Sequence, residues 1–153
     1  MKLSVRGEYA LRAMQLLAER YGGPVVSIQT LSDEQNIPKR FLEQILNDLK
    51  SSGLVESRRG MAGGYRLALA PAEIPLARII RYIDGALSPV SCVSERFYEK
   101  CSCPDETRCA LRSVMKEVRD TVAQMMEKTT LVDLIARAQK LRSVPMGPMD
   151  FVI

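Results

Sequence analysis

The chain has 153 residues, of which 46% are hydrophobic and 26% charged, and its net charge is +4. These values are typical of one folded domain with a hydrophobic core, and they exclude an intrinsically disordered chain. No run of about 18 apolar residues is present, which excludes a transmembrane helix, and Arg6, Glu8 and Arg12 interrupt any apolar signal segment. We therefore expect a cytoplasmic protein without a membrane partner, in which cysteine thiols stay reduced.

The first third of the sequence predicts three helices joined by short connections. Apolar side chains recur at three- and four-residue spacing over residues 4–20, which predicts an amphipathic helix. Ser27 is a suitable N-cap for a short second helix, and Pro38 suits the first position of a third helix that ends at Gly53. The apolar face of the third helix is formed by Phe41, Leu42, Ile45, Leu46 and Leu49. Two helices joined by a tight turn, the second with basic and amide side chains near its start, indicate a helix-turn-helix.

A β-hairpin is predicted directly after Gly53. Apolar and polar residues alternate in LVESRR and in YRLALA, which predicts two strands, and the glycine-rich segment GMAGG lies between them. Arg58, Arg59 and Arg66 flank this tip. Three helices followed by a basic hairpin indicate a winged helix-turn-helix in a chain that is mainly α-helical. The alternative is an ordinary helix–hairpin unit with a solvated basic face.

The charge of residues 38–66 favours DNA binding. This segment holds six basic and three acidic residues, and hence a net charge of +3 in a chain whose total is +4. Clustered cations provide affinity for the phosphates of duplex DNA. Gln44 and Arg40 match base edges in the major groove, a carboxylate such as Glu43 can accept from cytosine, and Arg59 beside Gly60 suits a narrow minor groove. The candidate DNA-binding residues are Lys39, Arg40, Glu43, Gln44, Lys50, Arg58, Arg59 and Gly60.

Two further helices and a short terminal one are predicted in the second half. LARIIRYIDG predicts a short helix that ends at Gly85, and a long helix begins at about Arg108. Thr130 and Asp133 resemble a capping box for a last helix to about Lys140. Along the long helix an apolar stripe follows heptad-like spacing: Leu111, Met115, Val118, Val122, Met125, Thr129 and Val132.

This stripe suits packing against another long helix, and no second helix of similar length is predicted in the chain. We therefore expect a symmetric homodimer. The residues expected in its interface are Leu111, Met115, Val118, Val122 and Met125. The alternative is that the stripe packs on the chain's own winged unit.

All four cysteines lie in the stretch from Cys92 to Cys109, together with Cys101 and Cys103. Their spacing lacks the C-x2–4-C pairs of structural zinc sites and the C-x-x-C of thioredoxin-like proteins. The chain has no histidine, which excludes a cysteine–histidine catalytic pair. Iron–sulfur clusters take thiolates at looser spacing. The chemistry therefore favours a cluster over zinc, and zinc over a dithiol switch.

The chain resembles the IscR-type winged-helix transcriptional regulators, a family that includes NsrR and CymR. The resemblance rests on MKLSVRGEYALRAM, FLEQILNDLKSSGLV, the wing RRGMAGGYRLA and three or more cysteines before a long helix, and it extends to about residue 138. It implies a homodimeric regulator, such as a repressor, with an iron–sulfur cluster held by three cysteines, 2Fe–2S ahead of 4Fe–4S. The implied targets are genes of iron–sulfur assembly or of stress responses.

The resemblance also assigns ligands. Cys92, Cys103 and Cys109 match the family's three cysteines, and Cys101 is surplus. A histidine that serves as fourth ligand in IscR is replaced here by Arg112, which cannot ligate iron. Glu8 stands where NsrR-like relatives provide an acidic ligand from the partner subunit, so Glu8 is the expected fourth ligand and Cys101 the reserve ligand. Glu43 corresponds to a residue associated in IscR with the choice between classes of DNA site.

These observations predict a winged helix-turn-helix DNA-binding domain over residues 1–85 and a cysteine-rich cluster loop over residues 86–109. A dimerisation helix and a short terminal helix follow over residues 108–140, and residues 141–153 form a tail without an assigned role. The expected function is transcriptional regulation through double-stranded DNA in response to cluster, redox or nitric oxide status. The alternatives are a zinc- or thiol-dependent regulator and a CymR-like module that acts through a protein partner. No catalytic residues and no small-molecule substrate are predicted, so we do not expect an enzyme.

Overall fold

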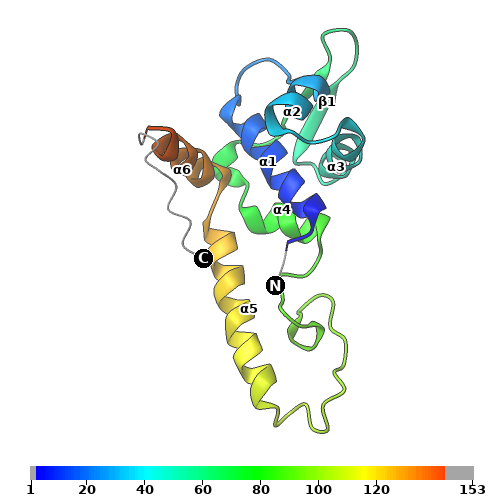
Figure 1. The fold of residues 1–153 in the computed structure, drawn as a ribbon, viewed down its shortest axis with the longest axis vertical. Coiled ribbons are helices and arrows are strands. Elements are labelled where there is room, and N and C mark those ends of the chain that lie inside the picture. The colour runs from blue at the N-terminus through cyan, green and yellow to red at the C-terminus, as the bar shows by residue number, and fades with distance from the viewer. Residues whose placement is uncertain (1–2, 144–153) are drawn as a thin grey trace.

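The computed structural model describes residues 3–143, and within them the fold is mainly α-helical with one β-hairpin (Figure 1). The predicted fold class is confirmed. The predicted tail falls mostly on residues 144–153, which lie outside the described residues. Among the helices of residues 3–143, none combines the length and the apolar character needed to cross a membrane. The elements are α1 (Val5–Glu19), α2 (Ile28–Gln35), α3 (Lys39–Ser51), β1 (Val55–Arg58), β2 (Gly64–Leu67), η1 (Pro71–Glu73), α4 (Leu76–Ile83), η2 (Ser91–Val93), α5 (Ala110–Lys128) and α6 (Leu131–Ser143), where η marks a short 3-10 helix.

Side-chain caps set the starts of the first two helices. Ser4 accepts a hydrogen bond from the Gly7 amide at 2.9 Å, and Ser27 accepts one from the Thr30 amide at 3.0 Å. Each hydroxyl satisfies a backbone donor that has no partner inside the helix. Pro38 lies at the N-cap of α3 rather than at its first helical position. The helices α2 and α3 with their tight turn form the predicted helix-turn-helix.

One hydrophobic core holds α1, α2, α3, the hairpin, α4 and the start of α6 together. Phe41, which was predicted to lie on the apolar face of α3, is 37% exposed and packs edge-on against Tyr9, with ring centroids 6.1 Å apart. The other four residues of that face are buried as predicted. Full burial of a large aliphatic side chain contributes about 1.5–3 kcal/mol. The core includes Met14, Leu17, Leu31, Leu42, Ile45, Leu46, Leu49, Leu54, Leu67, Ile79 and Leu131.

The wing is an antiparallel hairpin with a short third strand beside it. Val55 pairs with Leu67, and Arg58 pairs with Gly64. Val26 joins this sheet through an isolated bridge to Tyr65, with both N–H···O distances at 2.8 Å. A Cβ at Gly64 would lie 2.4 Å from the Val26 carbonyl oxygen, so only glycine permits this close approach.

The first turn of α1 is attached to both α3 and the end of α4. The Ser4 amide and hydroxyl both donate to the Asp84 carboxylate, and the amide distance is 3.0 Å. Arg6 forms an ion pair with Asp48 of α3. A Cβ at Gly7 would lie 2.3 Å from Asp84 Oδ2, so glycine at this position makes room for the carboxylate. The turn that carries Glu8 is therefore attached to α3 through Asp48 and to the end of α4 through Asp84.

The helix α5 extends away from the winged unit, and the segment that carries the cysteines lies beside its N-terminal half (Figure 1). None of its side chains is buried in the single chain. Its C-terminal end is bound to the winged unit, because the Leu76 amide donates to the Thr129 carbonyl at 2.9 Å and the Leu131 amide donates to the Ile74 carbonyl at 3.0 Å. Thr130 donates from its amide and hydroxyl to Asp133 at 2.8 Å, which confirms the predicted cap of α6.

Candidate functional site

The predicted DNA-binding residues are all exposed, on α3 and at the wing. They are Lys39, Arg40, Glu43, Gln44, Lys50, Arg58, Arg59 and Gly60. Among the described residues, Lys39, Lys50, Arg58 and Arg59 have no carboxylate partner within ion-pair distance. Their positive charge is therefore available to an anionic partner along a surface made by α3 and the hairpin.

Neighbouring side chains distinguish the arginines of this surface. The Arg40 guanidinium lies 4.9 Å from the centroid of the Phe41 ring, a cation–π contact that restricts its direction. Arg66 is paired across the hairpin with Glu56 at 2.9 Å, so its charge is offset, unlike the charges of Arg58 and Arg59. Met61, to which the sequence pattern assigned no role, is fully exposed at the wing tip.

We expect Arg59→Ala to weaken binding to every duplex, and most to duplexes with a narrow A·T-rich minor groove, because an unpaired wing cation adds electrostatic affinity and fits such a groove. The slope of log affinity against log salt should decrease in magnitude by about 1, the contribution of one phosphate contact. Fluorescence anisotropy with labelled duplexes over a salt series measures both quantities. Arg137→Ala, on the exposed surface of α6, is the matched control and should leave the slope unchanged. An unchanged slope for Arg59→Ala contradicts the assignment.

The four cysteines line one open pocket of about 430 Å³ at the N-terminal end of α5, together with Leu111, Arg112 and Met115. Cys92 is buried within η2, whereas Cys101, Cys103 and Cys109 are half-buried. The Cys103 and Cys109 sulfurs are 3.8 Å apart. Cys109 is also the N-cap of α5, and its sulfur accepts the Arg112 amide at 3.4 Å.

Hydrogen bonds among the thiols differentiate their acidity. Burial raises the pKa of Cys92, and the neighbouring Cys101 raises it further. The hydrogen bond from Cys103 lowers the pKa of Cys101, and the same bond raises the pKa of Cys103 to about 12. Cys101, which is surplus to the family pattern, lines the same pocket as Cys92 and Cys103.

The side chains that line this pocket suit a group bound through sulfur, although they are not already arranged around a single metal ion. Among the residues that the structure describes, no three histidine, cysteine, aspartate or glutamate side chains are already gathered around one ion position. Four soft sulfur donors nevertheless share one open pocket, which is the ligand type of iron–sulfur clusters. Glu8 does not line this pocket; its side chain is 58% exposed and lies 3.4 Å from Arg12. A ligand role for Glu8 therefore requires a second chain.

Two arginines of α5 contact the cysteine loop, and sequence patterns identified neither of these contacts. Arg112 Nε donates to the Cys92 carbonyl at 3.1 Å and lies 3.2 Å from Glu106 Oε1. Arg119 Nη1 donates to the Val93 carbonyl at 2.6 Å. The two contacts with backbone carbonyls join residues 20 and 26 positions apart, and the loop itself is irregular, so no periodicity could have revealed them.

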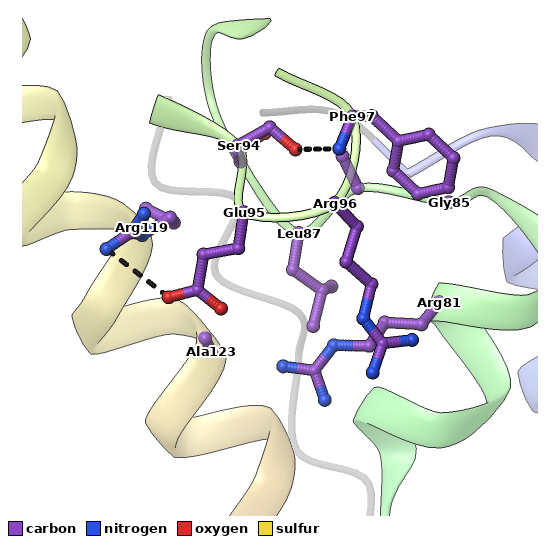
Figure 2. Close-up of a pocket in the computed structure, with 11 residues that line it drawn as sticks. Arg81, Gly85, Leu87, Ser94, Glu95, Arg96, Phe97, Arg119 and Ala123 are labelled. Atoms are coloured by element: carbon purple, nitrogen blue, oxygen red, sulfur yellow. Dashed lines mark hydrogen bonds and ion pairs between the residues drawn. The ribbon is translucent and has the colours of Figure 1, made fainter. Parts of the chain in front are cut away.

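A second, smaller pocket of about 50 Å³ lies between the end of α4, the loop and α5 (Figure 2). Arg119 lies 3.6 Å from Glu95 across this space, and Arg81 is paired with Glu127. Ser94 Oγ accepts the Phe97 amide at 3.0 Å, which closes the turn above the pocket. The residues around this pocket therefore hold the loop against α5.

The fold, the exposed basic surface and the cysteine pocket agree with a family of known regulators. A family model described as "Rrf2: Iron-dependent Transcriptional regulator" matches residues 3–137. The chain belongs to the Rrf2 family. Among its Rrf2 relatives, the HTH-type transcriptional regulator CymR of Bacillus subtilis is 34% identical over 134 residues, which cover 88% of this chain and 89% of CymR. IscR of Aliivibrio salmonicida is 31% identical over 135 residues, covering 88% of this chain and 77% of IscR.

Solved structures of Rrf2 regulators share the fold. The structure of CymR, described as the global cysteine regulator of B. subtilis, matches with a TM-score of 0.76 and 33% identity and covers 90% of this chain and 98% of CymR. IscR of T. potens matches with a TM-score of 0.74 and 28% identity, covering 96% of this chain and 94% of IscR. These similarities confirm the predicted family and fold class. This Rrf2 chain is a DNA-binding transcriptional regulator and not an enzyme.

Proposed function

We propose that this Rrf2 regulator is a homodimer whose DNA affinity or site choice is set by an iron–sulfur cluster, 2Fe–2S ahead of 4Fe–4S, bound in the cysteine pocket. The observation that carries the proposal is that all four cysteines line one pocket beside α5. When bound, the cluster supplies iron that responds to redox state or nitric oxide. The chain's own residues hold it through Cys92, Cys103 and Cys109. The controlled genes are those of iron–sulfur assembly or stress responses.

The fourth ligand in this proposal is Glu8 of a second copy of the chain, with Cys101 in reserve. Exposure of the Glu8 carboxylate supports the first assignment, because an exposed side chain is able to reach a neighbouring subunit. The position of Cys101 supports the second, because Cys101 lines the same pocket as Cys92 and Cys103. The two assignments differ in one respect: only the Glu8 site needs a dimer to be complete.

The dimer proposal rests on the apolar stripe of α5. Leu111 is 64% exposed, Val118 40% and Met125 60%, while Met115 and Val122 are half-buried in the single chain. Three of the five stripe residues are therefore exposed in the single chain, which supports a partner outside it. Pairing of two α5 helices across a two-fold axis would remove this surface from water. In this arrangement residues 1–85 bind DNA, residues 86–109 hold the cluster and residues 108–140 contribute the dimer helix.

The proposal is tested by anaerobic purification followed by iron and acid-labile sulfide analysis. We expect both in equal amounts, with visible absorption from sulfur-to-iron charge transfer. DNA duplexes are then selected from a random pool with the cluster-loaded protein and, separately, with the cluster-free protein. We expect the two forms of the protein to bind the selected duplexes with different affinities. Zinc without sulfide, or identical DNA affinity of the two forms, contradicts cluster control.

A thiol-dependent regulator is the second candidate, and one distance favours it. The Cys103 and Cys109 sulfurs are 3.8 Å apart, close enough for a small side-chain movement to bring them to bonding distance. A thiol regulator would show no sulfide on analysis and would lose two free thiols on treatment with an oxidant such as a small disulfide. Metal analysis and thiol counting on the same sample therefore separate the two candidates.

A further inference from the structure

We propose that Arg112 and Arg119 are positioning residues that fasten the turn of Cys92 to α5 and so place the first sulfur opposite the other three. The inference deepens the proposed cluster function, yet it concerns contacts within the cluster-free chain. The position of Arg112 is the one at which IscR-type relatives offer a histidine ligand. In this chain the side chain at that position reaches the backbone of a ligand residue instead.

The carbonyl groups of the turn at Cys92 need hydrogen-bond donors that the backbone of the turn does not supply. The helix η2 spans only three residues, so its carbonyl groups lack the partners that a longer helix provides. Cys92, Val93 and Ser94 are 8%, 3% and 8% exposed, and buried carbonyls left without a donor are costly. Arg112 Nε satisfies the Cys92 carbonyl at 3.1 Å, and Arg119 Nη1 satisfies the Val93 carbonyl at 2.6 Å.

The spacing of the two arginines matches this task. They are seven residues apart, which is about two helical turns, so both side chains leave α5 on the same side. That side lies next to the apolar stripe rather than on it, and the loop therefore packs beside the proposed dimer seam. Two parallel side chains from one rigid helix fix both the position and the direction of the turn.

Each arginine also contacts an acidic residue of the loop. Arg112 pairs with Glu106 at 3.2 Å, and Glu106 accepts the Tyr98 hydroxyl at 2.8 and 2.9 Å. Arg112 thus connects the beginning, the middle and the end of the cysteine-bearing segment. The Arg119 side chain is 14% exposed and lies 3.6 Å from Glu95 (Figure 2).

The charge of Arg112 suits the same site. Ligand thiolates bring several negative charges into one pocket, and a guanidinium at its wall offsets them without competing for iron. An alanine at this position would remove both the backbone contact and the charge. A lysine would keep the charge but lose the planar guanidinium, whose Nε lies 3.1 Å from the Cys92 carbonyl oxygen and 3.2 Å from the Glu106 carboxylate.

The test measures how accessible the Cys92 thiol is in the full-length, cluster-free protein. Labelling with a maleimide, followed by peptide mass spectrometry, reports the rate at each cysteine separately. We expect Arg112→Ala and Arg119→Ala each to raise the Cys92 labelling rate on the order of tenfold, because loss of a charged hydrogen bond frees the buried turn. Arg112→Lys should give an intermediate rate. Arg108→Ala is the matched control, because Arg108 adjoins Cys109 but is 88% exposed and does not contact η2.

Unchanged Cys92 labelling in both alanine variants overturns the proposal, as does equal acceleration in Arg108→Ala. Thermal unfolding separates local from global effects, and the lysine variants replace any alanine variant that fails to fold. Iron and sulfide content after reconstitution gives the second readout and should fall in Arg112→Ala but not in Arg108→Ala. If Cys92 becomes accessible in the variants while the unchanged protein never binds iron, the arginine contacts are upheld and the cluster function is rejected.

Discussion

Replacement of Cys103 or Cys109 by alanine is expected to abolish the visible absorption of the reconstituted protein and to reduce bound iron and sulfide to background. Both sulfurs lie in the pocket at the start of α5, 3.8 Å apart, so removal of either leaves a cluster without one of its thiolate ligands. Cys92→Ala should have the same effect, because it removes the buried sulfur of the same pocket. Absorption spectra with iron and sulfide assays on anaerobic samples measure the outcome.

Two further variants identify the fourth ligand. Glu8→Ala is expected to alter or destabilise the cluster, whereas Cys101→Ala should retain it; Ser102→Ala is the control, because it lies between two cysteines and carries no sulfur. Loss of the cluster in Cys101→Ala with a silent Glu8→Ala would instead place all ligands in one chain. A normal cluster in Cys103→Ala or Cys109→Ala contradicts the proposed site itself.

Val118→Glu is expected to convert the protein into a monomer. The substitution places a carboxylate on the stripe of each α5 helix, so that two like charges without partners would be buried in the proposed interface. The dissociation constant of the dimer should rise on the order of a hundredfold or more, and affinity for a two-half-site duplex should fall with it. Sedimentation velocity over a concentration series measures the first effect and anisotropy the second.

Gln124→Glu provides the matched control for the dimer test. It introduces the same carboxylate on the same helix, but on the face opposite the stripe, at an exposed position. An unchanged monomer–dimer equilibrium in Gln124→Glu, with dissociation in Val118→Glu, assigns the interface to the stripe. A protein that is monomeric without substitution would remove the basis of the proposed dimer and of the Glu8 ligand.

Local chemistry explains why the winged unit could be predicted from sequence. Ser27, Asn36 and Gly53 specify where helices begin and end through caps and backbone conformation, and both kinds of signal act within a few residues. In the wing, apolar and polar residues alternate because successive side chains of a strand point to the buried and to the exposed face, so the strands could be predicted as well. Phe41 was an exception, since the spacing of an apolar helix face cannot tell a buried ring from one that lies half-exposed beside Tyr9.

For the cysteine loop, the sequence predicted which residues it contains but not how the loop packs. The contacts of Arg112 and Arg119 with the backbone of this loop join residues 20 and 26 positions apart in the sequence. The attachment of Ser4 to Asp84 is of the same kind, with 80 positions between the two residues. Irregular segments have no repeating pattern from which such contacts follow. The family resemblance supplied the ligand assignment, which stays a prediction.

The way α5 joins the winged unit has a mechanical consequence. Main-chain hydrogen bonds at Leu76 and Leu131 fix one end of this helix to the core, and the cysteine pocket lies at its other end. Nineteen helical residues form a stiff rod about 28 Å long, so a tilt of about 5° at one end displaces the other by about 2 Å. A displacement of this size exceeds the range of about 0.5 Å over which hydrogen-bond distances vary. Under the proposed cluster function, a slight tilt of α5 at the sulfurs would therefore move the winged unit far enough to break contacts with DNA.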